Sequence, residues 1–159
     1  NVDEASAVKG NAHTEAVRAA IANEHAEMLI VAASAEADIA ELEDYDERQM
    51  FLEEVGLTES GVSRLIKSAY KLLDLQTYFT TGADESRAWT FTRGMKAPQA
   101  AGVIHSDLER GFIRAEVLKY NDMVELGSES ACKEKGKLFV EGKTYVVQDG
   151  DILNIRFNV

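Results

Sequence analysis

A glycine-lysine-threonine triplet is the first feature of this 159-residue sequence that suggests chemistry, because such a triplet ends the phosphate-binding P-loop of many nucleotide hydrolases. Gly142-Lys143-Thr144 follows Gly136, but a P-loop requires four residues between its two glycines, and here there are five. Phe139-Val140 and Tyr145-Val146 predict a hairpin around Glu141-Gly142, whereas a P-loop joins a strand to a helix. We therefore expect no phosphate binding here, and no other pair of glycines completes the G-x-x-x-x-G-K-[ST] pattern.

Metal and nucleophile chemistry has little support in the sequence. The histidines are His13, His25 and His105. They are far apart in the chain and far from the single cysteine, Cys132. Ten carboxylates lie between Glu36 and Glu59, but their spacing places them on the outer faces of helices rather than in a cleft. We expect solvated helix surfaces there, no metal site and no catalytic residue. His105 and Asp107 are expected to form a structural hydrogen bond at the end of a short helix.

Basic side chains in the second half of the chain fit a binding role. They are Arg110, Arg114, Lys119, Lys133, Lys135 and Lys137. If they converge in the fold, they form a positive patch suited to RNA phosphates, and otherwise they belong to an ordinary mixed surface. Trp89 alternates with threonines, which allows base stacking, but we expect it in the core.

The first half of the chain has the alternation of helices and apolar runs typical of a doubly wound α/β sheet. Met28–Ala33 predicts a strand buried on both faces, and Ser34 is expected to cap the helix that follows it. Helices are predicted over residues 14–26, 35–42, 46–55 and 60–75, the last with an apolar stripe of Val62, Leu65, Ile66, Ala69 and Leu73. Because the residues before Met28 cannot supply a sheet, we interpret residues 1–75 as the last part of a larger α/β domain.

The second half has the pattern of short strands, turns and short helices. Residues 87–92, 112–117 and 152–157 predict strands, and Ala97–Ile104 predicts a helix with Pro98 in its first turn. Asn121 and Ser128 are expected to cap two further helices. The pattern favours a small α+β domain with a mixed sheet over residues 76–159.

The charge of the chain is unevenly divided. The net charge is -11. Residues 1–75 hold 6 basic and 16 acidic side chains, whereas residues 76–159 hold 11 basic and 12 acidic side chains, so nearly all the net negative charge belongs to the first half. An acidic chain of this kind is unsuited to coating DNA or membranes, and its longest apolar run is far shorter than the ~20 residues of a membrane span. With one cysteine and no signal-peptide pattern, we expect a cytoplasmic protein without a membrane partner.

Ordered segments spread over the second half resemble the YchF (Obg-like ATPase) family of translation-associated P-loop proteins. These segments are Leu72–Thr80, Arg87–Thr90, Lys96–His105, Gly111–Val117 and Val147–Asp151, with Phe157–Val159 at the end. The resemblance implies that residues 76–159 form a TGS domain, which has the α+β β-grasp (ubiquitin-like) fold. It also implies that residues 1–75 are the α/β remnant of a P-loop nucleotide-binding domain. The family's P-loop, switch regions and helical insertion have no counterpart in this sequence.

Within this resemblance, Asn1-Val2-Asp3-Glu4 corresponds to the Asn-Lys-x-Asp motif with which P-loop GTPases bind guanine. The family's Asn-x-x-Glu form implies weaker selection of guanine and a preference for ATP. The resemblance therefore assigns nucleotide-base contacts to Asn1, Val2 and Glu4, and to Ser34 and Ala35 in a second loop. Asp3 is assigned no role. Without the resemblance, the four residues would be simply a polar, solvated segment.

Two functions follow from these observations. The first is the C-terminal part of a protein that binds ATP (or GTP) with Mg²⁺, hydrolyses ATP and associates with the ribosome or RNA. Because this chain lacks the P-loop, we expect it to be inactive alone and to hold no nucleotide. The alternative is a stand-alone β-grasp module that binds RNA or protein and has no nucleotide role. Neither function predicts an oligomeric state.

Overall fold

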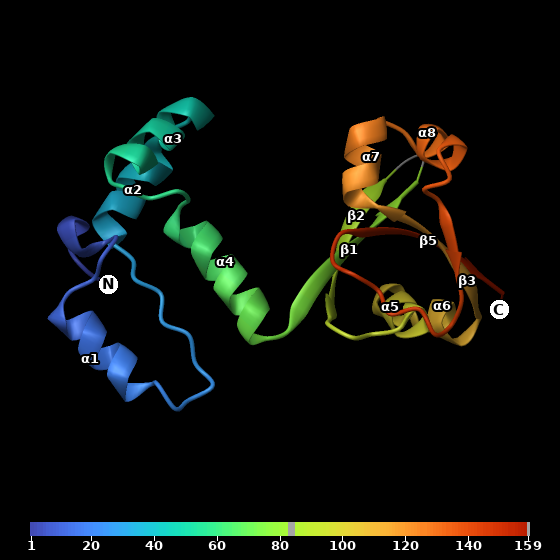
Figure 1. The fold of residues 1–159 in the computed structure, drawn as a ribbon, viewed down its shortest axis with the longest axis horizontal. Helices are drawn as coiled ribbons and strands as arrows, with labels where there is room; N and C mark the ends of the chain where they lie inside the picture. Colours follow the sequence, from blue (N-terminus) through green and yellow to red (C-terminus); the bar gives the residue numbers. More distant parts are fainter. Residues whose placement is uncertain (83–84, 159) are drawn as a thin grey trace. The chain divides into compact units, whose positions relative to one another are not determined.

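The computed structural model describes residues 1–82 and 85–158, and it divides the chain into two units (Figure 1). Unit 1 comprises Asn1–Leu73 and unit 2 comprises Asp74–Val159. Val159, the last residue of the segments that resemble a known family, lies outside the described residues.

Unit 1 consists of short helices, most of which start at a residue whose side chain caps them. They are η1 (Glu4–Ser6), α1 (Ala12–Ala20), α2 (Ala33–Glu41), α3 (Tyr45–Glu54) and α4 (Gly61–Leu72). The side chains of Asn11, Asp44 and Ser60 accept hydrogen bonds from N–H groups in the first turns of α1, α3 and α4. The structure thus confirms each predicted helix of this half, although α1 ends at Ala20 instead of residue 26.

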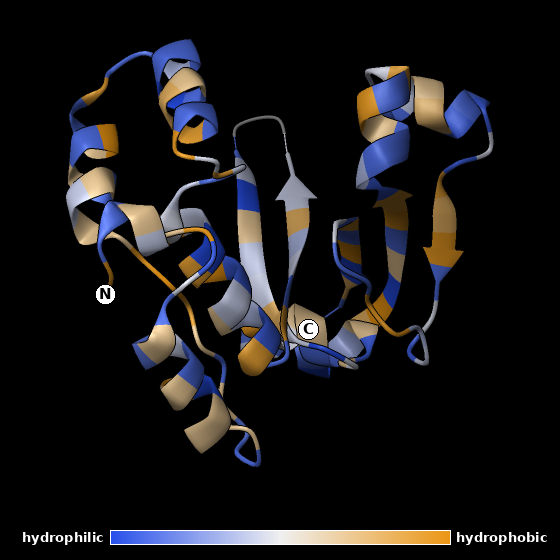
Figure 2. Cartoon of the chain, turned by 60° about the vertical axis from the view of Figure 1, so that its left-hand side comes forward, coloured by the Kyte–Doolittle hydropathy of each residue, from blue (hydrophilic) through white to orange (hydrophobic). Residues whose placement is uncertain are grey.

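The apolar segment Met28–Ala33, predicted to be a buried strand, is not a strand. It leads as coil into α2, which already begins at Ala33, and Figure 2 shows it in the hydrophobic colour. Among the described residues, one backbone hydrogen bond links the segment to another part of the chain, from the Val2 N–H to the Val31 carbonyl oxygen at 2.9 Å. A buried strand needs a neighbouring strand to pair with, and the described residues of unit 1 contain none.

The apolar stripe predicted for the last helix of unit 1 lies on α4 and is uncovered. Val62, Leu65 and Ile66 are 62%, 57% and 54% exposed, and Leu73, just beyond the helix, is 61% exposed. An amphipathic helix normally buries such a stripe against another element. Within the part of the chain that the structure describes, nothing fully covers this face of α4.

Unit 2 is built around a five-stranded mixed sheet. Its strands are β1 (Leu75–Thr81), β2 (Ser86–Thr92), β3 (Phe112–Lys119), β4 (Phe139–Glu141) and β5 (Asp151–Phe157), in the order β2-β1-β5-β3-β4. β1 and β5 are parallel, and the other neighbours are antiparallel. Helices α5 (Ala97–Ile104) and α6 (Ser106–Arg110) connect β2 to β3, and α7 (Tyr120–Leu126) and α8 (Glu129–Glu134) connect β3 to β4. The predictions of β2, β3, β5, α5 and the Ser128 cap of α8 are confirmed.

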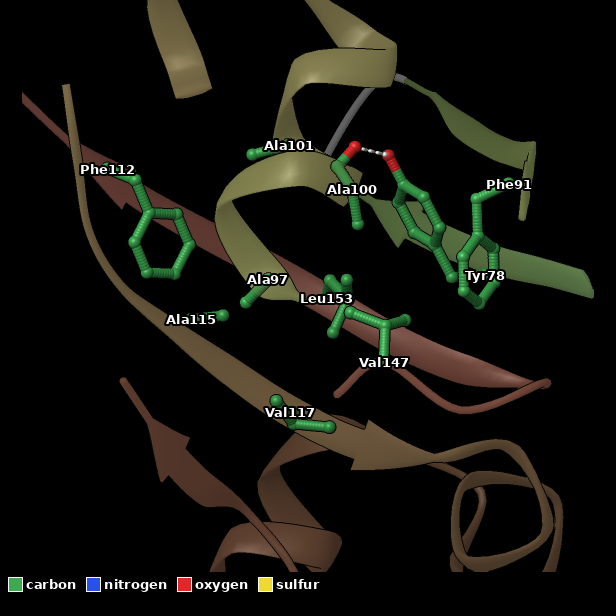
Figure 3. Packing of buried hydrophobic residues seen from close by; sticks show 10 residues of the cluster. All are labelled: Tyr78, Phe91, Ala97, Ala100, Ala101, Phe112, Ala115, Val117, Val147 and Leu153. Atoms are coloured by element: carbon green, nitrogen blue, oxygen red, sulfur yellow. Dashed lines mark hydrogen bonds between the residues drawn. The ribbon is translucent and has the colours of Figure 1, made fainter. Parts of the chain in front are cut away.

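The core of unit 2 lies between the sheet and α5 (Figure 3). Small alanines on α5 allow close approach to Tyr78, Val117 and Leu153 of the strands, all of them buried. The Tyr78 hydroxyl donates a 2.8 Å hydrogen bond to the carbonyl oxygen of Ala100, so this buried polar group is satisfied. A second cluster joins the opposite face of the sheet to α7 and α8, through Leu118, Ile152 and Cys132.

Two local predictions in unit 2 are wrong. Tyr145-Val146 does not form a hairpin with Phe139-Val140, because β4 pairs with β3, and Val146 forms only an isolated bridge with Lys96. Asn121 does not cap a helix, since it lies inside α7, whose N-cap is Lys119. For Tyr145-Val146, the pairing of β4 with the distant strand β3 outweighs the local turn preference.

Candidate functional site

Two loops of unit 1 that the family resemblance predicts to contact a nucleotide base are joined by hydrogen bonds. The Asn1 side-chain oxygen accepts a 3.1 Å hydrogen bond from the N–H of Ala33, the first residue of α2. The neighbouring Val2 N–H bonds to Val31 just before the helix. The start of the chain is therefore fixed beside the N-terminus of α2, and Asn1 takes part in capping it.

The N-terminus of α2 retains free hydrogen-bond donors. Ser34 is not the helix cap as predicted, since it lies in the first turn, and the N-cap, Ala32, has no side-chain acceptor. In the described part of the chain, the N–H groups of Ser34 and Ala35 have no acceptor, as is usual for a first helical turn without a full cap. Ser34 is exposed, whereas the Ala35 side chain is buried. These donors and the adjacent Asn1 amide can bind acceptor atoms on the edge of a planar ligand.

The two carboxylates of the Asn1–Glu4 segment differ in their surroundings. The Asp3 side chain accepts a 2.9 Å hydrogen bond from the Ser6 N–H, and this bond lowers the pKa of Asp3. Asp3 therefore caps η1, a structural role that sequence analysis did not assign, although an aspartate just before a short helix is a common cap signal. Glu4 is exposed, and its carboxylate has no hydrogen-bond or ion-pair partner among the described residues.

The predicted base-contacting residues do not all line one pocket. Asn1 and Val2 line a hollow of about 420 Å³ beside α1 and Met28. Glu4 lines a separate hollow of about 700 Å³ that is bounded by Phe51 of α3. The structure thus brings Asn1, Val2 and the start of α2 together and places Glu4 at a neighbouring hollow.

The other chemically suggestive residues have structural surroundings. Gly142-Lys143-Thr144 lies in the exposed connection between β4 and β5, not between a strand and a helix. His105 links α5 to α6, and its Nδ1 accepts a 3.2 Å hydrogen bond from the Asp107 N–H, as expected. Glu27 forms an ion pair with Lys71, whose hydrogen bond lowers the pKa of Glu27. In residues 1–82 and 85–158, no group of His, Cys, Asp and Glu side chains is arranged to hold a metal ion.

Three of the six predicted basic binding residues are engaged by carboxylates. Arg110 pairs with Asp107 at 2.6 Å, and Lys137 pairs with Asp122 at 3.1 Å. Lys119 donates a 2.5 Å hydrogen bond to Asp151, which is fully buried.

The Lys119 contacts form a small, partly buried network. The Tyr145 hydroxyl donates a hydrogen bond to the other Asp151 oxygen at 2.7 Å and accepts one from Lys119 at 3.0 Å. Burial lowers the pKa of Lys119, but its hydrogen bonds to Asp151 and Tyr145 outweigh burial and raise it overall. Burial, together with the Asp151 carboxylate, also raises the pKa of Tyr145. Lys119, the last residue of β3, is therefore bonded to the first residue of β5.

The remaining basic residues, Arg114, Lys133 and Lys135, are exposed and have no carboxylate partner among the described residues. The six side chains do not gather at one point, because Arg110 and Arg114 flank the start of β3 whereas α8 follows the other end of that strand. Sequence analysis also missed Arg156, which lies directly opposite Arg114 on β5. The signal that could have found Arg156 is its place in the alternating strand Ile152–Phe157.

No helix within the described ranges is both long and apolar enough to cross a membrane.

Comparison with protein-family profiles matches residues 75–158 to the C-terminal YchF-GTPase family, which is described as a protein of unknown function (DUF933). The curated relatives include proteins named ribosome-binding ATPase YchF. That of Bacillus subtilis (strain 168) is 55% identical over 157 residues, which are 99% of this chain and 43% of the relative. That of Escherichia coli O157:H7 is 49% identical over 159 residues, 100% of this chain and again 43% of the relative. The chain therefore spans less than half the length of these relatives.

A eukaryotic relative and two solved structures extend the comparison. Obg-like ATPase 1 of Caenorhabditis elegans is 51% identical over 113 residues, 71% of this chain and 28% of the relative. The structure of the Schizosaccharomyces pombe YchF GTPase matches with a TM-score of 0.81 and 33% identity, over 98% of this chain and 42% of that one. A GTP-binding protein from Pyrococcus horikoshii OT3 shares the fold, with a TM-score of 0.59 and 18% identity over 98% of this chain and 44% of that one.

Proposed function

The chain belongs to the YchF family, and we propose that it is the C-terminal part of a ribosome-binding, ATP-hydrolysing protein. In this proposal residues 1–75 complete a P-loop nucleotide-binding domain, and residues 76–159 form a TGS domain that contacts RNA or the ribosome. The relatives' names support the activity and the partner, while the chain covers 43% of their length.

The exposed apolar surfaces of unit 1 support the proposal of an incomplete nucleotide domain. The apolar segment Met28–Ala33 has no strand beside it among the described residues, and the stripe on α4 is more than half exposed at Val62, Leu65 and Ile66. A strand and a helix face of this composition fit a central parallel sheet with helices packed on it. The part of the relatives that lies outside this chain would supply that sheet.

The sheet order of unit 2 supports its assignment as a β-grasp TGS domain. A parallel pair, β1 and β5, lies at the centre, and the chain enters through the β1–β2 hairpin and crosses to β3 by way of α5. Helix α5, packed on one face of this sheet, fits the β-grasp fold that the family resemblance implies.

The hydrogen bond between Asn1 and Ala33 is the observation that carries the nucleotide proposal. It joins the Asn-x-x-Glu segment to the α2 N-terminus, where the N–H groups of Ser34 and Ala35 have no acceptor within the described residues. These groups fit the edge of an adenine or guanine base, with Glu4 nearby as an additional acceptor. Bound ATP with Mg²⁺ would supply the triphosphate chemistry, and its phosphates require the P-loop that this chain lacks. The chain by itself is therefore inactive.

A nucleotide titration tests this proposal on the longer protein that contains this chain. Asn1→Ala removes the amide and releases Ala33, so ATP affinity should fall about five- to tenfold, the effect of about one hydrogen bond of ~1 kcal/mol. Asn23→Ala removes an exposed amide from the same unit and should leave the affinity unchanged. Equal affinities for both variants and the parent would contradict the proposed base site.

The alternative function is a stand-alone β-grasp module that binds RNA or protein. The observation that favours it is the family match, which covers residues 75–158 and leaves unit 1 out. Upstream sequence separates the two functions. A G-x-x-x-x-G-K-[ST] segment before Asn1 in the intact gene supports the ATPase, and its absence supports the stand-alone module.

A further inference from the structure

The second face of the unit 2 sheet is covered at one end and open at the other. Helices α7 and α8 pack over Leu118 and Ile152, which lie opposite each other on β3 and β5. In Figure 1 both helices lie at one end of the unit, away from α5 and α6. Farther along the same face, β3 presents Glu116 and Arg114, and β5 presents Asn154 and Arg156. Arg114, Asn154 and Arg156 are exposed, so this end of the sheet is available to a partner.

A β-bulge ends the regular β3–β5 ladder just beyond Arg114. The β3–β5 register pairs Phe112 with Phe157 and then Arg114 with Arg156, so Ile113 is an extra residue. From Arg114 to Lys119 the ladder is regular, so Arg114 lies on the same face as Glu116 and Leu118 by strand alternation. Arg114 is therefore on the open face, directly opposite a second arginine, and the bulge beyond it allows Phe112 to enter the core.

The two arginines lack sufficient negative charge around them. Residues that oppose each other in antiparallel strands have Cβ atoms about 5 Å apart, and like charges in that position repel. Glu116 accepts a 3.0 Å hydrogen bond from Arg156 and a 3.3 Å hydrogen bond from the Asn154 amide. Arg114 has no carboxylate partner in the described residues, which leaves two guanidinium groups to one carboxylate. A second anion between the arginines would relieve the repulsion.

We propose that Arg114 and Arg156 bind the phosphodiester backbone of RNA on this open sheet face. The inference rests on the proposed function, in which unit 2 contacts RNA or the ribosome, and it identifies the surface. A guanidinium group presents a planar fork of N–H donors that matches phosphate oxygens. The exposed hydroxyl groups of Thr81 and Ser86, which pair across β1 and β2 on the same side of the sheet, add neutral donors suited to phosphate or sugar.

RNA fits this surface better than an acidic protein segment. The side chains between the arginines and the β1–β2 hairpin are polar, and the exposed apolar side chain of Val140 lies on the other side of Glu116, on the edge strand β4. Protein interfaces have an apolar, desolvated centre, whereas contacts to a nucleic acid backbone are polar and charged.

Fluorescence anisotropy with a labelled single-stranded oligouridylate tests the inference on the whole chain. The double variant Arg114→Gln/Arg156→Gln should lower RNA affinity about tenfold. The slope of log K against log salt concentration should become shallower by about 1.4, which is ~0.7 for each of two lost phosphate contacts. The matched control Arg87→Gln/Arg93→Gln removes two exposed positive charges from β2 and the turn after it, and it should keep nearly the full affinity and slope. Far-UV circular dichroism verifies that both variants are folded.

The outcomes separate this inference from the proposed function. If the parent chain binds RNA and the Arg114/Arg156 variant binds with unchanged affinity and slope, the site is wrong, while an RNA-binding function remains. If both double variants lose affinity equally, the effect is one of net charge, and the site is also wrong. If the chain binds ribosomes but not RNA, and the Arg114/Arg156 variant loses ribosome binding, the surface contacts a ribosomal protein and the RNA assignment is overturned. If neither RNA nor ribosomes bind the parent chain, the proposed function of unit 2 fails as well.

Discussion

Replacing Asp151 with asparagine should destabilise unit 2 markedly, although the two side chains have nearly the same shape. Asp151 is fully buried and accepts three hydrogen bonds, from Lys119, from the Tyr145 hydroxyl at 2.7 Å and from the Gln148 N–H at 2.9 Å. An asparagine retains one acceptor oxygen and replaces the other with an NH₂ donor, which faces either Lys119 or the Tyr145 hydroxyl and the Gln148 N–H. A donor then faces a donor in a buried position, and the ion pair with Lys119 is lost.

The size of the effect follows from these contacts. A hydrogen bond to a charged group contributes about 1.5–3 kcal/mol, and the value for Lys119 lies at the low end because its side chain is 41% exposed. We therefore expect Asp151→Asn to lower the free energy of unfolding by about 2 kcal/mol. For a domain of this size, each ~1 kcal/mol lowers Tm by roughly 4–8 °C, so a fall of roughly 8–16 °C is expected.

Trp89 fluorescence is a suitable probe, because this is the only tryptophan in the chain and it lies in β2 of unit 2. Its indole N–H donates a 2.9 Å hydrogen bond to Thr80, so unfolding of the sheet changes its surroundings. Glu134→Gln removes one exposed carboxylate from the same unit and serves as the control. A fall in Tm of less than about 3 °C for Asp151→Asn, or an equal fall for the control, would refute the reasoning.

Two further predictions concern the same unit. Folding raises the pKa values of Lys119 and Tyr145 above their ordinary values of 10.5 and 10.0, so each holds its proton more tightly in the folded state. The contribution of these two groups to stability is complete below about pH 10 and decreases as the pH rises through their folded-state pKa values. The urea midpoint of unfolding, followed by Trp89 fluorescence, should therefore be lower at about pH 11 than at about pH 9. Equal midpoints would contradict this prediction. Gly111→Ala should lower the free energy of unfolding by about 1–3 kcal/mol in urea titrations, because an added Cβ would collide with the backbone carbonyl of Asn158. The control Gly142→Ala should lower it little, because the space around Gly142 is open. Similar losses for the two variants would exclude the collision.

Elements with strong local signals were predicted correctly from the sequence. Pro98 in the first turn marks α5, and the Ser128 hydroxyl caps α8, where it accepts a 3.2 Å hydrogen bond from the Ala131 N–H. The alternating residues of β3 were also recognised. The bulge at Ile113 was not, because it depends on how β3 aligns with β5, a strand almost 40 residues away.

The errors arise where long-range pairing decides the structure. Met28–Ala33 has the composition of a buried strand, but composition does not provide a neighbour to pair with. Tyr145-Val146 has the composition of the second strand of a hairpin, but its expected partner β4 pairs with β3 instead, and Val146 forms only an isolated bridge with Lys96. The six basic residues share a charge, and charge alone did not indicate that buried Asp151 engages Lys119 while Arg114 remains free of a carboxylate partner in the described chain.

The site residues show a similar division. The resemblance pointed to Asn1, Ser34 and Ala35, and the structure brings Asn1 to the start of the same helix through Ala33. Asp3 received no role because it is the variable position of the base-binding motif, and its capping bond to Ser6 depends on the η1 turn that follows it.

A crystal structure of the longer protein with bound ATP tests the central claim most directly. We expect the adenine to lie within hydrogen-bond distance of the Asn1 side chain or of the Ser34 and Ala35 N–H groups. We also expect a strand to pair with Met28–Ala33 and the α4 stripe, including Leu65, to be buried. An adenine bound elsewhere, with Leu65 still exposed, would contradict the proposed base site and the proposed incomplete nucleotide domain.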